Sequence, residues 1–231
     1  MAGYITDNDN GVSGQMVTRL TFLTIGALCA ATSVAAEVEL SFYGGWQGAP
    51  ASDIAIRGDD AIADTDLTVA WDGRPFEAPP YYGLRVTKWD TPTFGYGLDF
   101  THNKVYPQDG ELPAEFDRLE FTDGLNTLTA NAYYRWDAGL GTITPYVGGG
   151  VGITVPHVEV ITSDSRTFGF QYTGPAATVI AGASMPINDQ WSVFGEYKGT
   201  ATFNEGDLDT GGTIETDIFT NALNIGVSFN F

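Results

Sequence analysis

The two histidines are the side chains of this chain best suited to proton transfer near neutral pH. His102 follows Asp99 and precedes Asn103, whereas His157 is followed two residues later by Glu159. Because imidazole titrates near neutrality, a histidine beside a carboxylate is the usual general base of an active site. His102, Asp99 and Asn103 are therefore the candidate catalytic residues. The competing interpretation is that both histidines lie at the edge of an apolar surface without a catalytic role.

Acidic residues dominate the charge of the chain, with 29 acids against 10 bases and a net charge of −19. Most of them lie in three segments: Asp53, Asp59, Asp60, Asp64, Asp66, Asp72 and Glu77; then Asp109, Glu111, Glu115, Asp117, Glu120 and Asp123; then Glu205, Asp207, Asp209, Glu215 and Asp217. This charge excludes nucleic acid as a partner, since phosphate binding needs basic patches. Carboxylate oxygens suit Mg²⁺ or Ca²⁺, so a divalent cation is the one cofactor that the sequence suggests, although no EF-hand spacing occurs. The alternative is a solvated acidic surface.

Six further charged residues alternate with apolar ones instead of clustering. They are Glu39, Arg85, Asp99, Arg135, Glu196 and Lys198. Alternation with period two places them on the polar face of β-strands. If that face is enclosed, the three acids and three bases must pair, because an unpaired buried charge is costly. We therefore predict a network of ion pairs among these six side chains.

Eight segments after residue 36 show this period-two alternation, which predicts β-strands. They are 38–46, 82–89, 94–101, 128–136, 147–155, 177–185, 191–198 and 221–231. Their connections alternate in length: 90–92, 137–141 and 186–190 are short, whereas 48–80, 105–125, 161–168 and 201–217 are long. An even number of strands with short turns at one end and long loops at the other is typical of bacterial outer-membrane barrels.

The predicted fold is therefore all-β, an eight-stranded antiparallel transmembrane up-and-down β-barrel with long extracellular loops and short periplasmic turns. Aromatic residues near both strand ends suit the two membrane interfaces. Eight strands leave an interior just wide enough for side chains to fill, so we expect a plugged polar lumen. The rival is a soluble lipocalin-type barrel, which would place the apolar residues inside.

Residues 1–36 have the composition of a secretory signal peptide. From Met16 the chain has a charged start, an apolar run and a small-residue site that ends at Ala36. We predict cleavage after Ala36 and a true start at Met16, with 1–15 a mis-assigned extension. The outer-membrane β-barrel domain is then 37–231. No run of about 18 apolar residues predicts a membrane-spanning helix.

Three segments carry a family resemblance: Tyr146-Val-Gly-Gly-Gly150, Phe194-Gly-Glu196-Tyr-Lys198 and the final segment 221–231, which ends on Phe231 without a polar tail. The chain resembles the small OmpA-like outer-membrane β-barrels over 37–231. In that family a C-terminal phenylalanine is an assembly signal. The resemblance thus implies that Phe231 is recognised by the barrel assembly machinery and that the protein lies in the outer membrane of a Gram-negative cell.

Two other segments, Phe76-Glu-Ala-Pro-Pro-Tyr-Tyr-Gly83 and Phe100-Thr-His-Asn-Lys-Val-Tyr106, resemble the outer-membrane barrels called lipid A oxidases. This resemblance implies an oxygen-dependent oxidation of the proximal glucosamine of lipid A to 2-aminogluconate, without a motif that assigns the catalytic residues. Lipid A deacylase barrels carry a serine two residues after their histidine. Lys104 stands at that position here, which argues against deacylation.

Two functions stay open at this point. The first is a structural or surface role of a plugged barrel that contacts outer-membrane lipid, lipopolysaccharide, ions or an external partner. The alternative is a lipid A-modifying enzyme of the oxidase type, with His102, Asp99 and Asn103 at its working end. A passive porin ranks third, because paired charges would close its lumen.

Overall fold

Residues 37–231 form a β-sheet that closes on itself. The computed structural model describes these residues, except the side chains at positions 122 and 123, and the predicted signal peptide lies outside them. The ring consists of β1 (Glu37–Gly48), β5 (Tyr82–Trp89), β6 (Phe94–Pro107), β7 (Phe116–Arg135), β8 (Thr144–Thr154), β11 (Gly174–Pro186), β12 (Trp191–Asp207) and β13 (Thr213–Asn230). Each strand pairs antiparallel with the next in this order, and β13 pairs with β1. The predicted fold class is confirmed.

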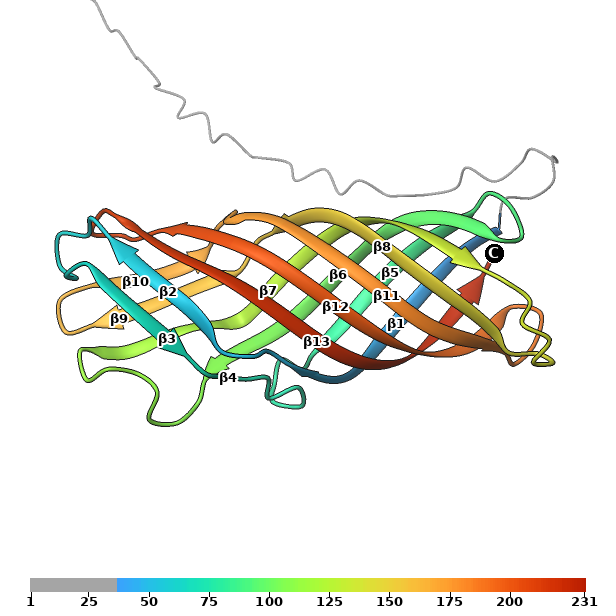
Figure 1. Ribbon diagram of the computed structural model, residues 1–231, viewed down its shortest axis with the longest axis horizontal. Coiled ribbons are helices and arrows are strands. Elements are labelled where there is room, and N and C mark those ends of the chain that lie inside the picture. Colours follow the sequence, from blue (N-terminus) through green and yellow to red (C-terminus); the bar gives the residue numbers. More distant parts are fainter. Residues whose placement is uncertain (1–36) are drawn as a thin grey trace, which may run out of the picture. The chain divides into compact units, whose positions relative to one another are not determined.

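Five shorter strands lie between the ring strands: three fall within the predicted long loop 48–80, and the other two flank and partly enter the predicted loop 161–168. They are β2 (Ser52–Arg57), β3 (Thr65–Val69), β4 (Trp71–Asp72), β9 (His157–Thr162) and β10 (Arg166–Phe170). β2 pairs with β13, β4 with β6 and β9 with β7, while β3 and β10 complete hairpins. Figure 1 shows β2, β3, β9 and β10 at the end opposite the C-terminus. These five strands and the outer ends of β6, β7, β12 and β13 are called the cap below.

Residue types exchange faces where β13 enters the cap. From Phe219 toward the C-terminus the outward side chains are apolar except Asn221, and most of them are exposed, whereas Glu215 and Asp217 are the outward residues just before it. Ile214 and Ile218, which face inward there, are buried. Apolar side chains face outward in lipid and inward in water. The exchange therefore marks the outer edge of an apolar band, and strand pairing continues beyond it.

The cap and the band have different interiors. The cap encloses a cluster of buried apolar side chains: Ile54, Ile56, Ile62, Val69, Trp71, Val105, Phe116, Leu119, Phe121, Leu125, Val158, Val160, Leu208, Ile214 and Ile218. Inside the band, aromatic rings lie over glycines, and a Cβ on Gly83 would fall 2.0 Å from the ring of Tyr43. A Cβ on Gly148 would fall 2.5 Å from Tyr133, in keeping with the close packing expected of the glycine run there. No helix long and apolar enough to cross a membrane occurs among residues 37–231.

Candidate functional site

A cluster of four buried charges crosses the barrel interior inside the apolar band. Arg85 on β5 binds Asp99 on β6 at 2.8 Å and Glu196 on β12 at 2.7 Å. Lys198, also on β12, lies 2.9 Å from the other oxygen of Asp99. The side chains of all four are at most 4% exposed. Two cations and two carboxylates compensate each other, which a low-dielectric interior requires.

Tyrosine hydroxyls complete the coordination of both carboxylates. Tyr43 donates a hydrogen bond of 2.6 Å to Asp99, and Tyr146 donates one of 2.6 Å to Glu196. The side-chain amide of Asn224 also donates a hydrogen bond to Glu196, at 3.1 Å. These residues were not predicted to take part, although Tyr43 alternates in register with Glu39 and Ser41 and that parity was the available signal. Hydrogen bonds to an ionised group are about twice as strong as neutral ones, so the cluster is firmly held.

The remaining two predicted network residues lie elsewhere. Arg135 pairs with Glu37 at 3.0 Å and covers the ring of Trp89, with 3.8 Å between guanidinium carbon and ring centre. Glu39 accepts a hydrogen bond of 3.2 Å from Ser41. The cavity that Glu39, Arg85 and Arg135 line together has a volume of about 20 Å³, roughly the room for one water molecule. The interior is therefore filled at this level.

His102 lies on the outward face of β6 at the outer edge of the apolar band. Its ring stacks on Tyr82 with centroids 5.3 Å apart, and its Nδ1 lies 2.8 Å from the side-chain oxygen of Asn126. The backbone of Gly124 covers the ring, since a Cβ there would fall 2.3 Å from it. The imidazole is only 5% exposed, so it is fixed and covered.

The three candidate catalytic side chains do not meet in this structure. Asp99 points inward to Arg85 and Lys198, whereas His102, an odd number of residues away, points outward. Asn103 donates to the backbone oxygen of Leu125 at 3.2 Å. An activity that needs all three groups at one substrate atom has no shared site here, and a role for His102 alone stays a prediction.

The other residues singled out at this level pack within the cap. His157 is buried, with its ring edge-to-face against Phe168 and Phe170 at centroid distances of 4.4 and 4.8 Å. The ammonium group of Lys104, which stands in the serine position of the deacylases, donates to the backbone oxygens of Glu77 and Pro79 at 2.9 and 2.7 Å. Lys104 thus ties together the two segments that resemble lipid A oxidases.

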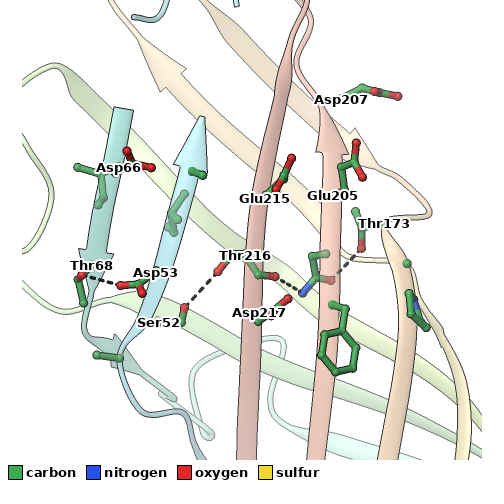
Figure 2. Close-up of a pocket in the computed structure, with 18 of the residues that line it drawn as sticks. Ser52, Asp53, Asp66, Thr68, Thr173, Glu205, Asp207, Glu215, Thr216 and Asp217 are labelled. Atoms are coloured by element: carbon green, nitrogen blue, oxygen red, sulfur yellow. Dashed lines mark hydrogen bonds between the residues drawn. The ribbon is translucent and has the colours of Figure 1, made fainter. Parts of the chain in front are cut away.

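An acidic groove of about 1180 Å³ runs over the outer face of the cap. Figure 2 shows its carboxylates on neighbouring strands, and six of them line it: Asp53, Asp66, Glu205, Asp207, Glu215 and Asp217. Glu205 lies directly opposite Glu215 in the strand register, an arrangement of like charges that destabilises a sheet. Arg57 pairs with Asp66, and Thr68 donates to Asp53 at 2.7 Å. No group of three or more potential metal ligands converges within the described part of the chain.

Comparison with known proteins gives a family over nearly the whole chain. A family model described as an outer membrane protein beta-barrel domain matches residues 20–231. Among solved structures the chain is similar to Neisserial surface protein A, with 15% identity and a TM-score of 0.45 over 84% of this chain and 96% of that one. No curated protein matches.

Two further solved structures come from Pseudomonas aeruginosa. The N-terminal β-barrel domain of OprF is 17% identical, with a TM-score of 0.43 over 84% of this chain and 97% of that one. The outer membrane protein OprG is 12% identical, with a TM-score of 0.48 over 85% of this chain and 96% of that one.

Proposed function

Because the chain belongs to the family of outer membrane protein β-barrel domains and lies in the outer membrane, we propose that it is a closed-lumen barrel with a structural or surface role at the lipopolysaccharide leaflet. The observation that carries this proposal is the cluster of Arg85, Asp99, Glu196 and Lys198, which fills the lumen inside the apolar band. A closed interior leaves the outer wall and the cap as the surfaces available to a partner.

Divalent cations are the expected link between the acidic cap and an anionic leaflet. The groove carboxylates begin beside Phe203 and Phe219, at the outer edge of the apolar band. Carboxylates and lipid phosphates at this depth repel each other unless Mg²⁺ or Ca²⁺ neutralises them. Since no trio of described carboxylates converges, such an ion would take its remaining ligands from phosphate and water.

Limited proteolysis tests this function directly. The purified barrel is placed in bilayers that contain lipopolysaccharide or phospholipid alone, with Mg²⁺ or with a chelator. We expect the cap to be cleaved several-fold more slowly with lipopolysaccharide and Mg²⁺ than in the other three conditions. Equal cleavage in all four conditions contradicts a role at this leaflet.

The lipid A-modifying alternative retains one supporting observation. His102 and Asn126 form a polar pair at the outer edge of the apolar band, the depth at which the glucosamine of lipid A lies. Mass spectrometry of lipid A from aerated cells with and without the protein tests it. A species with one more oxygen that disappears in His102→Ala supports the enzyme, whereas unchanged lipid A removes the alternative.

A further inference from the structure

One strip of the cap does not follow the exchange of faces seen on β13. Phe168, Phe170 and Tyr172 alternate with inward residues and leave their rings 52%, 62% and 65% exposed. Phe168 and Phe170 stand two residues apart on β10 and share its outward face, and Tyr172 follows two residues beyond the end of that strand. These three exposed rings are called the aromatic strip below, and exposed apolar surface of this kind is typical of an interaction site.

Hydrogen bonds fix the height of this strip relative to the acidic groove. The side-chain amide of Gln171 donates to the backbone oxygen of Asp207 at 2.9 Å and accepts from its backbone nitrogen at 2.8 Å. The backbone nitrogen of Glu205 donates to Thr173 at 2.8 Å. Tyr172 thus lies level with Glu205 and Asp207 and lines the acidic groove with them, while Phe168 and Phe170 lie outside its lining.

The strip also continues the lipid-facing surface below it. Val151 and Ile153 on β8 and Val179 on β11 are 68%, 41% and 59% exposed. These two strands pair with each other, and β9 and β10 connect them in the sequence. Aromatic side chains at such a border are suited to the membrane interface, where one side is apolar and the other wet. A ligand on the strip therefore sits on the outer leaflet and reaches above its acyl chains.

A cation stands at the outer end of the strip. Arg166 lies over Phe168, with 5.0 Å between the guanidinium carbon and the ring centre, and it forms no ion pair with a described residue. Beneath the rings, His157 packs against both Phe168 and Phe170. The rings of Phe168 and Phe170 are thus held by packing against His157, and the guanidinium of Arg166 is available to an anion.

We propose that Arg166, Phe168, Phe170 and Tyr172 form a binding strip for a phosphorylated glycolipid of the outer leaflet. The apolar faces of sugar rings stack on the aromatic rings, and the guanidinium pairs with a phosphate, the anion whose geometry it matches best. This inference rests on the proposed function, because it names one lipopolysaccharide contact of the same surface. The contact is direct and needs no divalent cation, unlike the contacts expected of the acidic groove.

Binding of labelled lipopolysaccharide to the purified barrel in phosphatidylcholine nanodiscs, with a chelator present, tests the strip. We expect Arg166→Gln to weaken binding about tenfold and Phe168→Ser with Phe170→Ser to weaken it at least as much. Removing the phosphates from the glycolipid should weaken binding to the native protein by the same factor as Arg166→Gln and should leave the affinity of that variant unchanged. Inorganic phosphate and phosphatidylglycerol at equal concentration should not compete.

Two matched variants serve as controls. Arg57→Gln removes a cap arginine beside Asp66, and Phe76→Ser removes a ring that is 66% exposed outside the strip. Both should bind lipopolysaccharide as the native protein does. Equal binding by the strip variants and the native protein overturns the inference, as does competition by phosphatidylglycerol. The proposed function is not affected by that outcome if lipopolysaccharide with Mg²⁺ still protects the cap from proteolysis, and it falls if this protection is absent.

Discussion

Arg85 and Glu196 face each other across the barrel interior and are joined by two hydrogen bonds of 2.7 and 2.9 Å. Their strands, β5 and β12, are not neighbours, since β1 and β13 lie between them in the ring. The parallel pair of bonds between a guanidinium and a carboxylate fixes orientation as well as distance. The pair therefore connects two non-adjacent strands, as a brace across the barrel, and it also fills the interior.

Replacing Arg85 by Met should destabilise the barrel by about 3–5 kcal/mol, because it leaves Glu196 as an uncompensated buried charge. Urea unfolding in lipid vesicles, followed by tryptophan fluorescence, measures the loss. Arg85→Met combined with Glu196→Gln should recover part of it, since both partners are then neutral. The exposed pair of Arg57 and Asp66 provides the control, and Arg57→Met should leave the midpoint nearly unchanged. Equal midpoints for Arg85→Met and Arg57→Met would refute the brace.

Asp59 should make the tip of the cap sensitive to acid. Partial burial alone would raise the pKa of Asp59, but hydrogen bonds from Thr210 and the backbone nitrogens of Ala61 and Ile62 hold it below its ordinary value of 3.8. Because the folded-state pKa is lowered, the stabilisation by these hydrogen bonds is complete above the ordinary pKa and is lost as the pH falls through the folded-state pKa. The protection factors of the tip amides, which correct for the slower intrinsic exchange in acid, should therefore fall as the pH drops below 3.8. In Asp59→Asn these protection factors should be low throughout and lose this dependence; an unchanged profile would rule the contact out.

The cap should unfold separately when its apolar cluster is damaged. Ile56 is fully buried, and Ile56→Ala leaves a cavity that costs about 2–5 kcal/mol. Protease cleavage of the cap on intact cells should become several-fold faster, while the heat-modifiable gel mobility of the barrel is retained. Ile187→Ala, at a position 61% exposed, is the matched control and should change neither. If cleavage is unaltered in Ile56→Ala, the cap is not held by this cluster.

Phe231 should matter for assembly and not for the stability of the assembled barrel. Its ring is 72% exposed and packs only on Phe229 among the aromatic contacts of the described chain, at 4.8 Å. Phe231→Ser should lower the amount of folded protein in the outer membrane several-fold and leave the unfolding midpoint of the purified barrel unchanged. Phe203→Ser, at another exposed aromatic residue, should change neither the amount of folded protein nor the unfolding midpoint. Normal levels of Phe231→Ser would contradict an assembly signal.

Sequence patterns predicted the wall of the barrel well, because its outward face meets lipid and its inward face meets the polar interior. Alternation placed all eight ring strands and all three short turns. It did not predict β2 or the outer end of β13, where the buried Ile54, Ile56 and Ile214 still alternate with outward residues but acidic side chains such as Asp53 and Glu215 stand on the outward face. Outside the lipid, charged residues mark a solvated strand face as readily as a loop, so composition cannot separate the two.

The sequence predicts which face of the wall carries the charged residues, but it does not predict which residues pair with each other. Parity places Arg85, Asp99 and Arg135 on the inward side, yet Arg135 lies at another height and pairs with Glu37. Height depends on strand register, which one sequence does not supply. The burial of His102 was equally hidden, because a register shift between Asn103 and Val105 and the backbone of Gly124 produce it.

Conductance across a planar bilayer tests the closed lumen most directly. With Arg85, Asp99, Glu196 and Lys198 in place, the purified native barrel should pass no steady ionic current. Arg85→Ser combined with Glu196→Ser, which removes the brace without leaving a lone charge of that pair, should open measurable single-channel steps. A steady open channel in the native protein would contradict the account and make the barrel a pore.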